Sequence, residues 1–392
     1  GVVQGFASCL ITKDRPTVPG FLKKNGYDTA IIGKWHLNFK YLNPENGKEY
    51  SRSKYKIPPV GAKIPDGPIH RGFDYFHGFH HARNMEAVIE NDEVIEHDPV
   101  INMLPRLTRK SVKYIESQKD SKKPFFLYVP LGSPHTPIVP TPEWEGKSGL
   151  GIYGDFVMQT ENVVGEIQSA LKRIKADQNT MIIFTSDNGC SKAAGINKLA
   201  EQGHVVSANL RGSKADLWDG GHRIPFIVKW PGRVKPGTES DQLICLTDFF
   251  STISDLLGQK LPQNGAEDSV SFLPALYGKK IVSTRKGVIH HSISGHFAYR
   301  QGPWKLLLAK ASGGWTSPNE RQAPNGSPPG QLYNMSTDLG EKKNLYKEKS
   351  EMVASLLALL EKDIKRGRST KGPRSKNDIN NIKIWKSGQP KK

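Results

Sequence analysis

Four short apolar runs, each followed by polar or glycine-rich sequence, restrict the fold of this chain more than any other feature. They read YDTAIIG (27–33), PFFLYVPL (124–131), TMIIFTS (180–186) and RIPFIVKW (223–230). Nearly continuous apolar runs of this length are typical of strands buried on both faces of a parallel sheet. We therefore expect four such strands.

Helical periodicity lies between and after these runs. In YGDFVMQTENVVGEIQSALKRIK (153–175), apolar side chains recur every three or four residues and basic residues fill the last turn. Residues 104–118 and 247–258 are further helix candidates, and Gly258 is a stop signal for the second. This alternation predicts a doubly wound α/β domain, with helices on both faces of a mostly parallel sheet.

The pattern changes in the last quarter of the chain. HFAYRQGPWKLLLA and GQLYNMSTD indicate short strands on either side of a loop rich in Gly, Pro, Ser and Asn, and SEMVASLLALLEKDI (350–364) indicates a helix. Residues 40–70 have neither period and are expected to form a long surface insertion. We expect an α/β domain (1–285), a small antiparallel sheet with a terminal helix (286–365) and a basic tail (366–392).

Charge and composition narrow the possible partners. The net charge of +18 over 392 residues favours an anionic partner. Nucleic acid is not the expected one, because the excess charge lies largely in the tail and no zinc-finger spacing or aromatic platform accompanies it. No apolar run approaches the roughly 20 residues that span a bilayer, so no membrane segment is expected. The three cysteines form no disulfide framework.

Polar side chains follow each predicted strand. In doubly wound sheets, ligands bind outside the carboxyl ends of the strands. Two lysines, two histidines and an Asp-Asn pair should therefore meet at one edge. The side chains that reach this edge are Lys34 and His36 after the first strand, His135 in GSPHTP, Asp187 and Asn188 in SDNG, and Arg211, Lys214 and Asp219 in RGSKADLWDGGHR.

These residue types suit the hydrolysis of a charged ester. Asp187 and Asn188 offer adjacent hard oxygen ligands, which suit Ca²⁺ or Mg²⁺. Lysines and histidines around such a cation neutralise a tetrahedral oxyanion and can protonate a leaving oxygen. The set therefore indicates a sulfate or phosphate ester hydrolase. Redox chemistry is not indicated, because the chain has no dinucleotide-binding glycine motif.

Each element also has a structural interpretation. SDNG alone favours a turn over a metal site by about three to one. His135, between two prolines, could be a hydrogen-bonded corner, and Lys34 alone could be a solvated loop lysine. Trp35 fits a core position, and Asp219 before GGHR fits a scaffold turn better than a catalytic pair. The joint placement at strand ends is what favours a functional site.

Several segments, in this order, resemble the type I sulfatases: GKWHL, PHTP, FTSDNG and RGSKADLWDGGHRIPFIVKWPG. RGFDYFHG (71–78), LTDFFSTISDLLG (246–258), YRQGPWKLLL and LYNMSTDLGEKKNLY extend the resemblance from about Arg15 to Tyr346. The chain is most similar to arylsulfatases and N-acetylgalactosamine-6-sulfatase-like enzymes. The resemblance implies an alkaline-phosphatase-like fold and sulfuric ester hydrolysis.

The resemblance also implies roles for individual residues. Lys34 and Lys214 would bind the sulfate group, His36 would contact the nucleophile and help release sulfate, and His135 would face the ester oxygen. Asp187 and Asn188 would be two ligands of one Ca²⁺ ion. Further residues expected to bind substrate or shape its pocket are His204 in loop 190–210, Arg211, the His80–His81 pair and the insertion 40–70.

The nucleophile of the family is absent from the sequence. It is a formylglycine made from Cys or Ser in a C/S-x-P-S/A-R motif, and SCLITKDR around Cys9 lacks the Pro and the Arg at the required offsets. We therefore expect the nucleophile, and the family's first strand with its paired aspartates, to lie upstream of Gly1. On this interpretation the chain is an N-terminally truncated sulfatase that does not turn over sulfate esters by itself.

Two other functions remain open. One is a phosphodiesterase or phosphonate monoester hydrolase of the same superfamily, although Lys34 with His36 in GKWHL, and Lys214, favour sulfate. The other is a non-catalytic protein that binds polyanions through its basic surface. The expected partner is a sulfated carbohydrate or an aryl sulfate, and the glycan fits the charge better. The resemblance implies a periplasmic or secreted protein, and the oligomeric state is left open.

Overall fold

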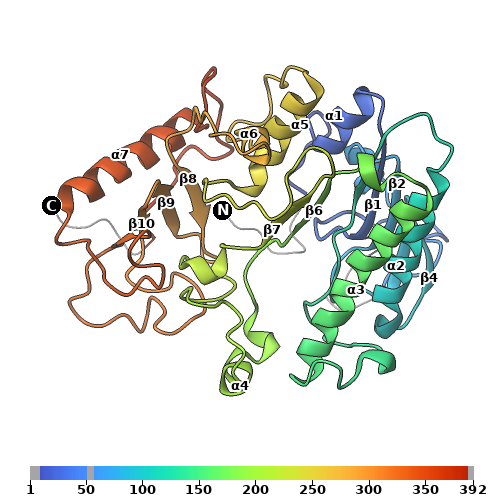
Figure 1. The fold of residues 1–392 in the computed structure, drawn as a ribbon, viewed down its shortest axis with the longest axis horizontal. Helices are drawn as coiled ribbons and strands as arrows, with labels where there is room; N and C mark the ends of the chain where they lie inside the picture. The colour runs from blue at the N-terminus through green and yellow to red at the C-terminus, as the bar shows by residue number, and fades with distance from the viewer. Residues whose placement is uncertain (1–8, 51–56, 387–392) are drawn as a thin grey trace. The chain divides into compact units, whose positions relative to one another are not determined.

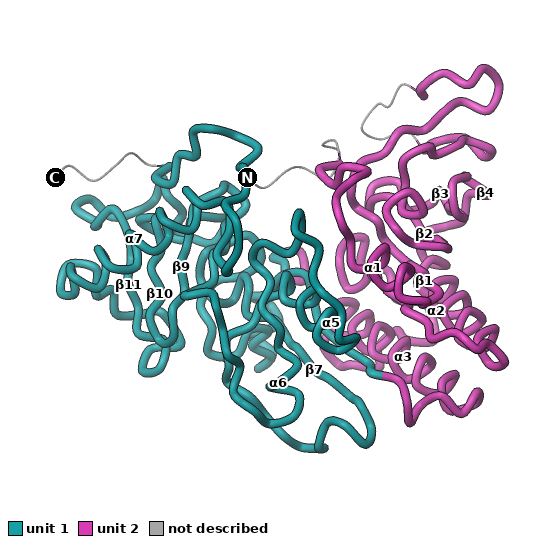
Figure 2. The backbone as a smooth tube through the Cα atoms, turned by 90° about the horizontal axis from the view of Figure 1, so that it is seen from above, with its two compact units in different colours: residues 1–2, 181–192, 196–392 teal, residues 3–180, 193–195 magenta. Residues whose placement is uncertain are grey.

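The computed structural model describes residues 9–50 and 57–386 (Figure 1). Positions 51–56 of the expected insertion and 387–392 of the expected tail lie outside the described residues. The chain forms two compact units (Figure 2). The N-terminal unit comprises residues up to Thr180 together with 193–195, and the C-terminal unit comprises 181–192 and the chain from Ile196 onward.

A five-stranded mixed sheet, in the order β4-β3-β2-β1-β5, forms the centre of the N-terminal unit. β1 is parallel to both β2 and β5, whereas β3 is antiparallel to β2 and β4. The prediction of a mostly parallel central sheet is confirmed, although the sequence pattern did not reveal β2, β3 or β4. The strands are β1 (Asp28–Lys34), β2 (Tyr75–Phe79), β3 (Ala87–Glu90), β4 (Glu93–His97) and β5 (Phe125–Tyr128).

Strand β1 is buried on both faces, as its apolar run predicts. Neighbouring residues of a strand point to opposite faces. Ile31 accordingly joins one apolar cluster with Phe76, and Ile32 joins another with Met103 of helix α2. Helix α2 packs against β1 and β2, and helix α3 packs against α2. The helices of this unit are α1 (Val18–Lys24), α2 (Val100–Ser117) and α3 (Ile152–Arg173).

The expectation that residues 40–70 form a surface insertion is wrong for several of them. Tyr41, Ala62 and Ile64 are almost completely buried, in the same apolar cluster as Ile31 of β1. Isolated bridges join Leu42 to Lys63 and Lys63 to Glu93. The described part of the segment is mostly irregular and so lacks a strand or helix period, and several of its apolar residues reach the core while Val60 stays exposed.

The C-terminal unit contains an antiparallel pair, β6 (Ile182–Thr185) and β7 (Phe226–Lys229). The prediction that these runs are parallel strands buried on both faces is wrong, since Phe184 and Ile227 are exposed. Within the described residues the two strands pair only with each other. Helix α5 (Phe249–Leu257) ends at Gly258 in the left-handed conformation, as predicted. The other short helices of the unit are α4 (Ile196–Glu201) and α6 (Leu273–Leu276).

A four-stranded antiparallel sheet in the order β11-β10-β9-β8 forms the rest of the C-terminal unit, and it confirms the prediction of a small sheet with a terminal helix. Helix α7 (Ser350–Arg366) packs on one face of the sheet (Figure 1). Leu217 and Trp218, from the loop that carries Lys214, pack on residues of β9, β10 and β11. The strands are β8 (Val288–His291), β9 (Phe297–Gln301), β10 (Trp304–Leu307) and β11 (Gln331–Asn334).

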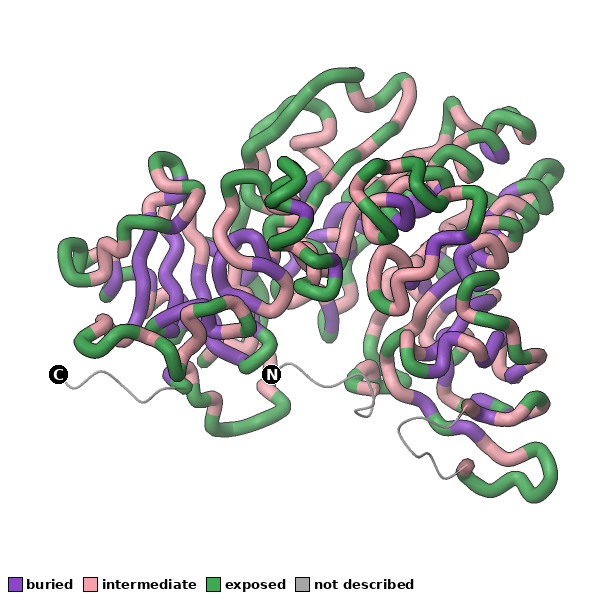
Figure 3. The backbone as a smooth tube through the Cα atoms, turned by 90° about the horizontal axis from the view of Figure 1, so that it is seen from below, coloured by how far each residue is buried: buried purple, intermediate pink, exposed green. Residues whose placement is uncertain are grey.

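Most residues are buried in β1 to β3 of the N-terminal unit and in β9 to β11 of the C-terminal unit (Figure 3). No helix of the described residues is long and apolar enough to cross a membrane. Single turns of 3₁₀ helix occur in several connections. They are η1 (Pro68–Arg71), η2 (Pro142–Trp144), η3 (Asp177–Asn179), η4 (Lys192–Ala194), η5 (Asp219–Gly221) and η6 (Leu246–Asp248).

A buried lysine joins the C-terminal sheet to the Lys214 loop. Lys305 of β10 is fully buried, and its Nζ donates to Asp219 Oδ1 at 2.6 Å and to Glu341 Oε1 at 2.8 Å. The Asp219 backbone N–H donates to Glu341 Oε2 at 2.6 Å. Burial tends to raise the pKa of Asp219, but the charge of Lys305 and its hydrogen bond hold that pKa below its ordinary value. Asp219 is therefore a scaffold residue, as its sequence context predicts.

Replacing Lys305 with Met should lower the free energy of unfolding by about 3–5 kcal/mol, because two buried carboxylates lose their cation. Urea unfolding followed by circular dichroism measures this change. The matched control is Lys63→Met, since Lys63 forms an ion pair with Glu93 at 2.5 Å while its side chain is 55% exposed. That control should cost less than about 1 kcal/mol. Equal effects of the two variants would contradict the prediction.

Buried neutral histidines should make stability fall on acidification. Burial lowers the pKa of His77, His222 and His291 to about 4, and that of His290 well below 6.5. The unfolded chain therefore binds more protons than the folded chain between about pH 6.5 and 4, so stability is full above pH 6.5 and is lost as pH falls toward 4. Each such histidine contributes a slope of up to about 1.4 kcal/mol per pH unit.

The variant His222→Gln, which keeps a polar side chain but cannot titrate, should reduce this slope by roughly 1 kcal/mol per pH unit. Urea unfolding at pH 4.5, 5.5 and 6.5 measures it. His204→Gln is the control, because His204 is exposed. An unchanged slope in His222→Gln would show that this histidine is not held neutral by the fold.

Candidate active site

The carboxyl end of β1 is held by backbone hydrogen bonds on both sides. The Lys34 N–H donates to Pro130 O at 2.7 Å, in the chain after β5. The His36 N–H donates to His80 O at 2.7 Å, in the chain after β2. His36 has a positive φ of 65°, which turns the chain directly after the strand. Lys34 and His36 are therefore presented at a corner whose backbone is fixed by both neighbouring segments.

Two glycines allow these segments to approach so closely. A Cβ on Gly33 would lie 2.2 Å from Pro130 O, and a Cβ on Gly78 would lie 1.9 Å from Gly33 O. Both residues also have φ values that side chains rarely adopt, 148° and 159°. Any larger residue at either position would separate the strand ends that carry Lys34.

A cluster of basic groups forms around His81 in the N-terminal unit. The His36 and His81 rings have centroids 4.9 Å apart. Burial is the main reason that the pKa of His81 falls to about 4, so its ring is neutral at neutral pH. Neighbouring positive charges also lower this pKa, and they come from His36, Lys34, Arg83 and His135. The structure thus brings together three of the predicted site residues and the predicted pocket residue His81.

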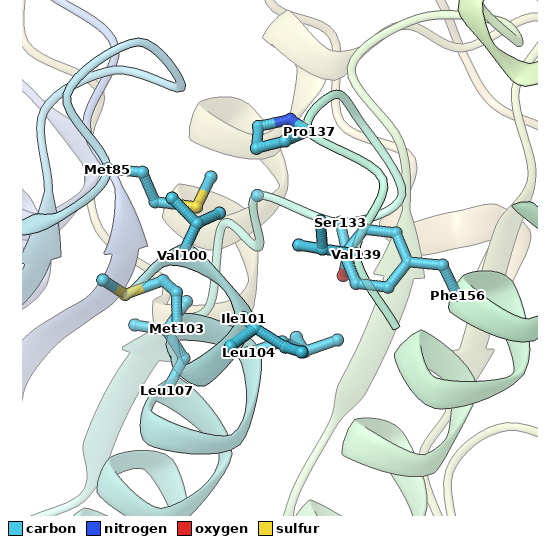
Figure 4. Close-up of a pocket in the computed structure, with 11 residues that line it drawn as sticks. Met85, Val100, Ile101, Met103, Leu104, Leu107, Ser133, Pro137, Val139 and Phe156 are labelled. Atoms are coloured by element: carbon cyan, nitrogen blue, oxygen red, sulfur yellow. The ribbon is translucent and has the colours of Figure 1, made fainter. Parts of the chain in front are cut away.

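His135 is oriented by its own loop. Its Nδ1 lies 2.7 Å from Thr136 O, a carbonyl that can only accept, so in the neutral ring Nδ1 carries the proton and Nε2 is the basic nitrogen. The loop rests on apolar side chains of α2 and α3 that surround a cavity of about 10 Å³ (Figure 4). A cavity of that size holds at most one water molecule, so it supports the loop and does not bind substrate.

In the C-terminal unit, the chain after β6 is bonded to the Lys214 loop. The Gly189 N–H donates to Gly221 O at 3.0 Å, and the Lys214 N–H donates to Cys190 O at 2.8 Å. A Cβ on Gly189 would lie 1.8 Å from Gly220 O, so only glycine permits this approach. Asp187 and Asn188, at the end of β6, are therefore held next to the loop that carries Lys214.

The donor chemistry of Asp187 and Asn188 fits a hard cation. Asp187 is exposed, and the pair offers a carboxylate and an amide oxygen on neighbouring residues. Ca²⁺ takes six to eight oxygen ligands, so these two could supply only part of its coordination. Across the described ranges, no group of three or more His, Cys, Asp or Glu side chains is placed to hold a metal ion.

Asp216 organises the Lys214 loop, and sequence reasoning missed it. Its side chain is buried, and Oδ2 accepts from the Ser213 N–H at 2.8 Å. Its Oδ1 accepts from the N–H groups of Trp315 at 2.9 Å and Thr316 at 3.0 Å. The signal in the sequence is a carboxylate two residues after Lys214 within the short polar stretch GSKAD.

Two residues predicted to bind substrate have other surroundings. The Arg211 guanidinium lies 3.6 Å from the Trp218 ring centroid and donates to Glu341 O at 2.7 Å. These contacts tie Arg211 to the scaffold. His204 is exposed after helix α4, and its backbone N–H donates to Leu199 O. A substrate contact of either residue stays a prediction, as does the assembly of both units' residues into one site.

Two family models match the chain. The model described as Sulfatase matches residues 7–259, and the model described as N-sulphoglucosamine sulphohydrolase, C-terminal, matches residues 213–310. The first covers well over half of the chain and includes every predicted site residue. The second covers the Lys214 loop together with strands β8, β9 and β10.

Characterised proteins of similar sequence are sulfatases. An N-acetylgalactosamine-6-O-sulfatase of Bacteroides thetaiotaomicron is 31% identical over 92% of this chain and 79% of its own length. The mouse N-acetylgalactosamine-6-sulfatase is 29% identical over 76% of this chain. The chain spans 55% of the length of that mammalian relative.

Solved structures that are similar to this chain also include sulfatases. A Bacteroides thetaiotaomicron structure, described under the metabolism of multiple glycosaminoglycans, superposes with a TM-score of 0.77 at 27% identity, over 92% of this chain and 84% of that one. A sulfatase from Pseudoalteromonas sp. shares the fold, with a TM-score of 0.65 at 21% identity over 88% of this chain and 72% of that one. The predicted alkaline-phosphatase-like α/β fold is confirmed, and the chain belongs to the sulfatase family.

Proposed function

We propose that this chain binds the sulfate ester in an enzyme that removes 6-O-sulfate from N-acetylgalactosamine units of sulfated glycans. Members of its family are sulfuric ester hydrolases. The observation that carries the proposal is the basic cluster at the end of β1. There, Lys34, His36 and His135 lie close enough to His81 for their charges to lower its pKa.

A cluster of this kind fits an anion with several equivalent oxygens. After burial, which is the main cause, positive charges on its members also lower the pKa of His81. An anion bound among them relieves the repulsion between these charges. A sulfate monoester places three charged oxygens in one group, and these can accept from Lys34 and from the imidazole nitrogens at the same time.

The proposed roles are those that the resemblance to the sulfatase family implies. Lys34 and His36, on the fixed corner after β1, bind sulfate oxygens, and Lys214 binds a further sulfate oxygen. His135 hydrogen-bonds the ester oxygen through Nε2 and delivers a proton to it as the S–O bond breaks, which requires a protonated ring before that step. The alcohol leaves as a neutral hydroxyl, and the sulfate stays among the cationic groups.

Two groups that the family uses complete the proposal. A Ca²⁺ ion held in part by Asp187 and Asn188 would neutralise sulfate charge. A formylglycine would supply the attacking oxygen. Since the sequence has no C/S-x-P-S/A-R motif, the chain by itself should bind sulfate esters without turning them over.

The glycan substrate rests on two observations. The relative that is 31% identical over 92% of this chain is an N-acetylgalactosamine-6-O-sulfatase. The net charge of +18 also favours a polyanionic chain over a small aryl sulfate. Export to the periplasm or the medium belongs to the proposal, because a large, highly charged glycan does not cross a membrane unaided.

A protein that combines this chain with the formylglycine of the family should hydrolyse N-acetylgalactosamine 6-sulfate at least about a hundredfold faster than the 6-phosphate, measured as kcat/KM by release of the free sugar. Lys214→Ala and His135→Ala should each lower kcat/KM for the sulfate by about a hundredfold or more, through lost charge stabilisation and lost proton transfer. Lys63→Ala is the matched control, because its exposed lysine pairs with Glu93. Preference for the phosphate would favour a phosphoester hydrolase, and binding without hydrolysis would favour a polyanion-binding protein.

Calcium should bind at Asp187 and Asn188. Calorimetric titration of the chain with CaCl₂ should show one site, and Asp187→Asn should weaken binding by about tenfold or more, because it removes a charged ligand. Asp241→Asn is the control, since Asp241 is an exposed carboxylate of the same unit. Equal binding by wild type and Asp187→Asn would remove this part of the proposal.

A further inference from the structure

An exposed tryptophan lies on a fixed backbone next to the Lys214 loop. Trp315 is 49% exposed, although large aromatic side chains are usually covered. Its N–H donates to Asp216 Oδ1 at 2.9 Å, and its carbonyl accepts from Lys192 Nζ at 2.5 Å. Both polar groups of its backbone are thus bonded, so the indole is presented by a well-anchored segment.

The side chain of Glu320 holds the first residues of the same segment through hydrogen bonds from their backbone N–H groups. Its Oε1 accepts from the N–H groups of Ala311 at 2.8 Å and Gly313 at 3.2 Å, and its Oε2 accepts from the Lys310 N–H at 3.0 Å. One carboxylate therefore organises the turn before Trp315. A second carboxylate, that of Asp216, attaches the turn to the Lys214 loop.

These hydrogen bonds join the Trp315 segment to the loop that carries the proposed sulfate-binding lysine, Lys214. The two oxygens of Asp216 accept from Ser213 on one side of Lys214 and from Trp315 on the other segment. The hydroxyls of Ser213 and Thr316 are 3.0 Å apart, which forms a second connection between the segments. Lys192, which bonds the Trp315 carbonyl, lies two residues after Cys190, whose carbonyl accepts from Lys214.

We propose that Trp315 is a specificity-determining residue, the surface against which the pyranose ring of the sulfated sugar stacks while Lys214 binds its sulfate. This inference rests on the proposed function. One face of a pyranose carries C–H hydrogens with partial positive charge, and the face of an indole is electron-rich, so the two surfaces attract and exclude water. A tryptophan also supplies a large rigid contact at small entropic cost.

The polar surroundings favour a sugar over a protein partner. Protein-docking sites present contiguous apolar patches, whereas the residues bonded to the Trp315 segment are Lys192, Ser213 and Asp216. An exposed aromatic ring on a hydrogen-bonded segment matches a sugar, which offers one apolar face and several hydroxyls. Inorganic sulfate has no apolar face, so its affinity should not depend on Trp315.

Calorimetric titration of the full chain tests the inference with two probes, N-acetylgalactosamine 6-sulfate and sodium sulfate. Trp315→Ala should weaken binding of the sugar sulfate by about tenfold and leave sulfate affinity within about twofold. Trp315→Phe, which keeps an aromatic face, should retain sugar affinity within about threefold. Lys214→Ala should weaken both probes. Tyr277→Ala, which removes another exposed aromatic ring of the same unit, should change neither.

Unchanged sugar binding in Trp315→Ala, or equal losses for both probes, would overturn the inference. Thermal unfolding of Trp315→Ala separates a binding defect from a folding defect. If the alanine variant is unstable, the affinity of Trp315→Phe for the sugar sulfate tests the inference instead. A wild-type chain that binds sulfate but has no higher affinity for the sugar sulfate overturns only this inference. A chain that binds neither probe overturns the proposed function as well.

Discussion

The buried contact of Lys305 with Asp219 and Glu341 is the interaction on which the C-terminal part of the candidate site depends. The loop that carries Lys214 has little regular structure, so its shape must come from side chains that bond its backbone and ends. Lys305, at the centre of the small antiparallel sheet, binds Asp219 at the end of this loop, while Arg211 at its start bonds Glu341 O. The small sheet is thus the support of a site loop.

In the N-terminal unit, the candidate site residues are held in position in a different way. Its site residues follow a buried strand, and their backbone is bonded to the segments after two parallel neighbours. Gly33 and Gly78 make this possible, because side chains at these positions would separate the segments. The candidate site residues of the N-terminal unit therefore rely on close backbone approach, and those of the C-terminal unit rely on buried carboxylates. In both units, the candidate functional side chains stand on segments whose backbone is held by hydrogen bonds.

The parts of the fold that sequence could predict are those with local signals. β1, α3, α5 with Gly258, and α7 follow from apolar periodicity and stop residues. The burial of Tyr41 and Ile64 could not be predicted, because isolated apolar residues in an irregular segment carry no period. The antiparallel pairing of β7 was missed because an apolar run specifies neither strand direction nor partners.

The residues of the candidate site also divide into those that a local sequence pattern predicts and those that it does not. Lys34 and His36 lie at the end of β1 and His135 lies in the loop after the neighbouring strand β5, so their approach to His81 after β2 follows from the topology. Asp216 was missed because its role depends on Trp315, which lies 99 residues further along the chain. Contacts of this kind leave no pattern within a short window of sequence. Arg211 was predicted to bind substrate from its place in the loop before the 223–230 run, and that pattern does not reveal its contacts with Trp218 and Glu341.

Charge distribution links stability to function in the N-terminal unit. The fold keeps His81 neutral because burial and four basic neighbours disfavour its charged form. Such repulsion among positive groups is unfavourable for the empty site, and it persists because the flanking segments fix the backbone. An anion that binds there lowers the repulsion and makes protonation of His81 easier. By linkage, protonation then favours the anion to the same extent. On the proposed function, a sulfate group bound in this cluster would therefore be favoured by the charges that keep His81 neutral.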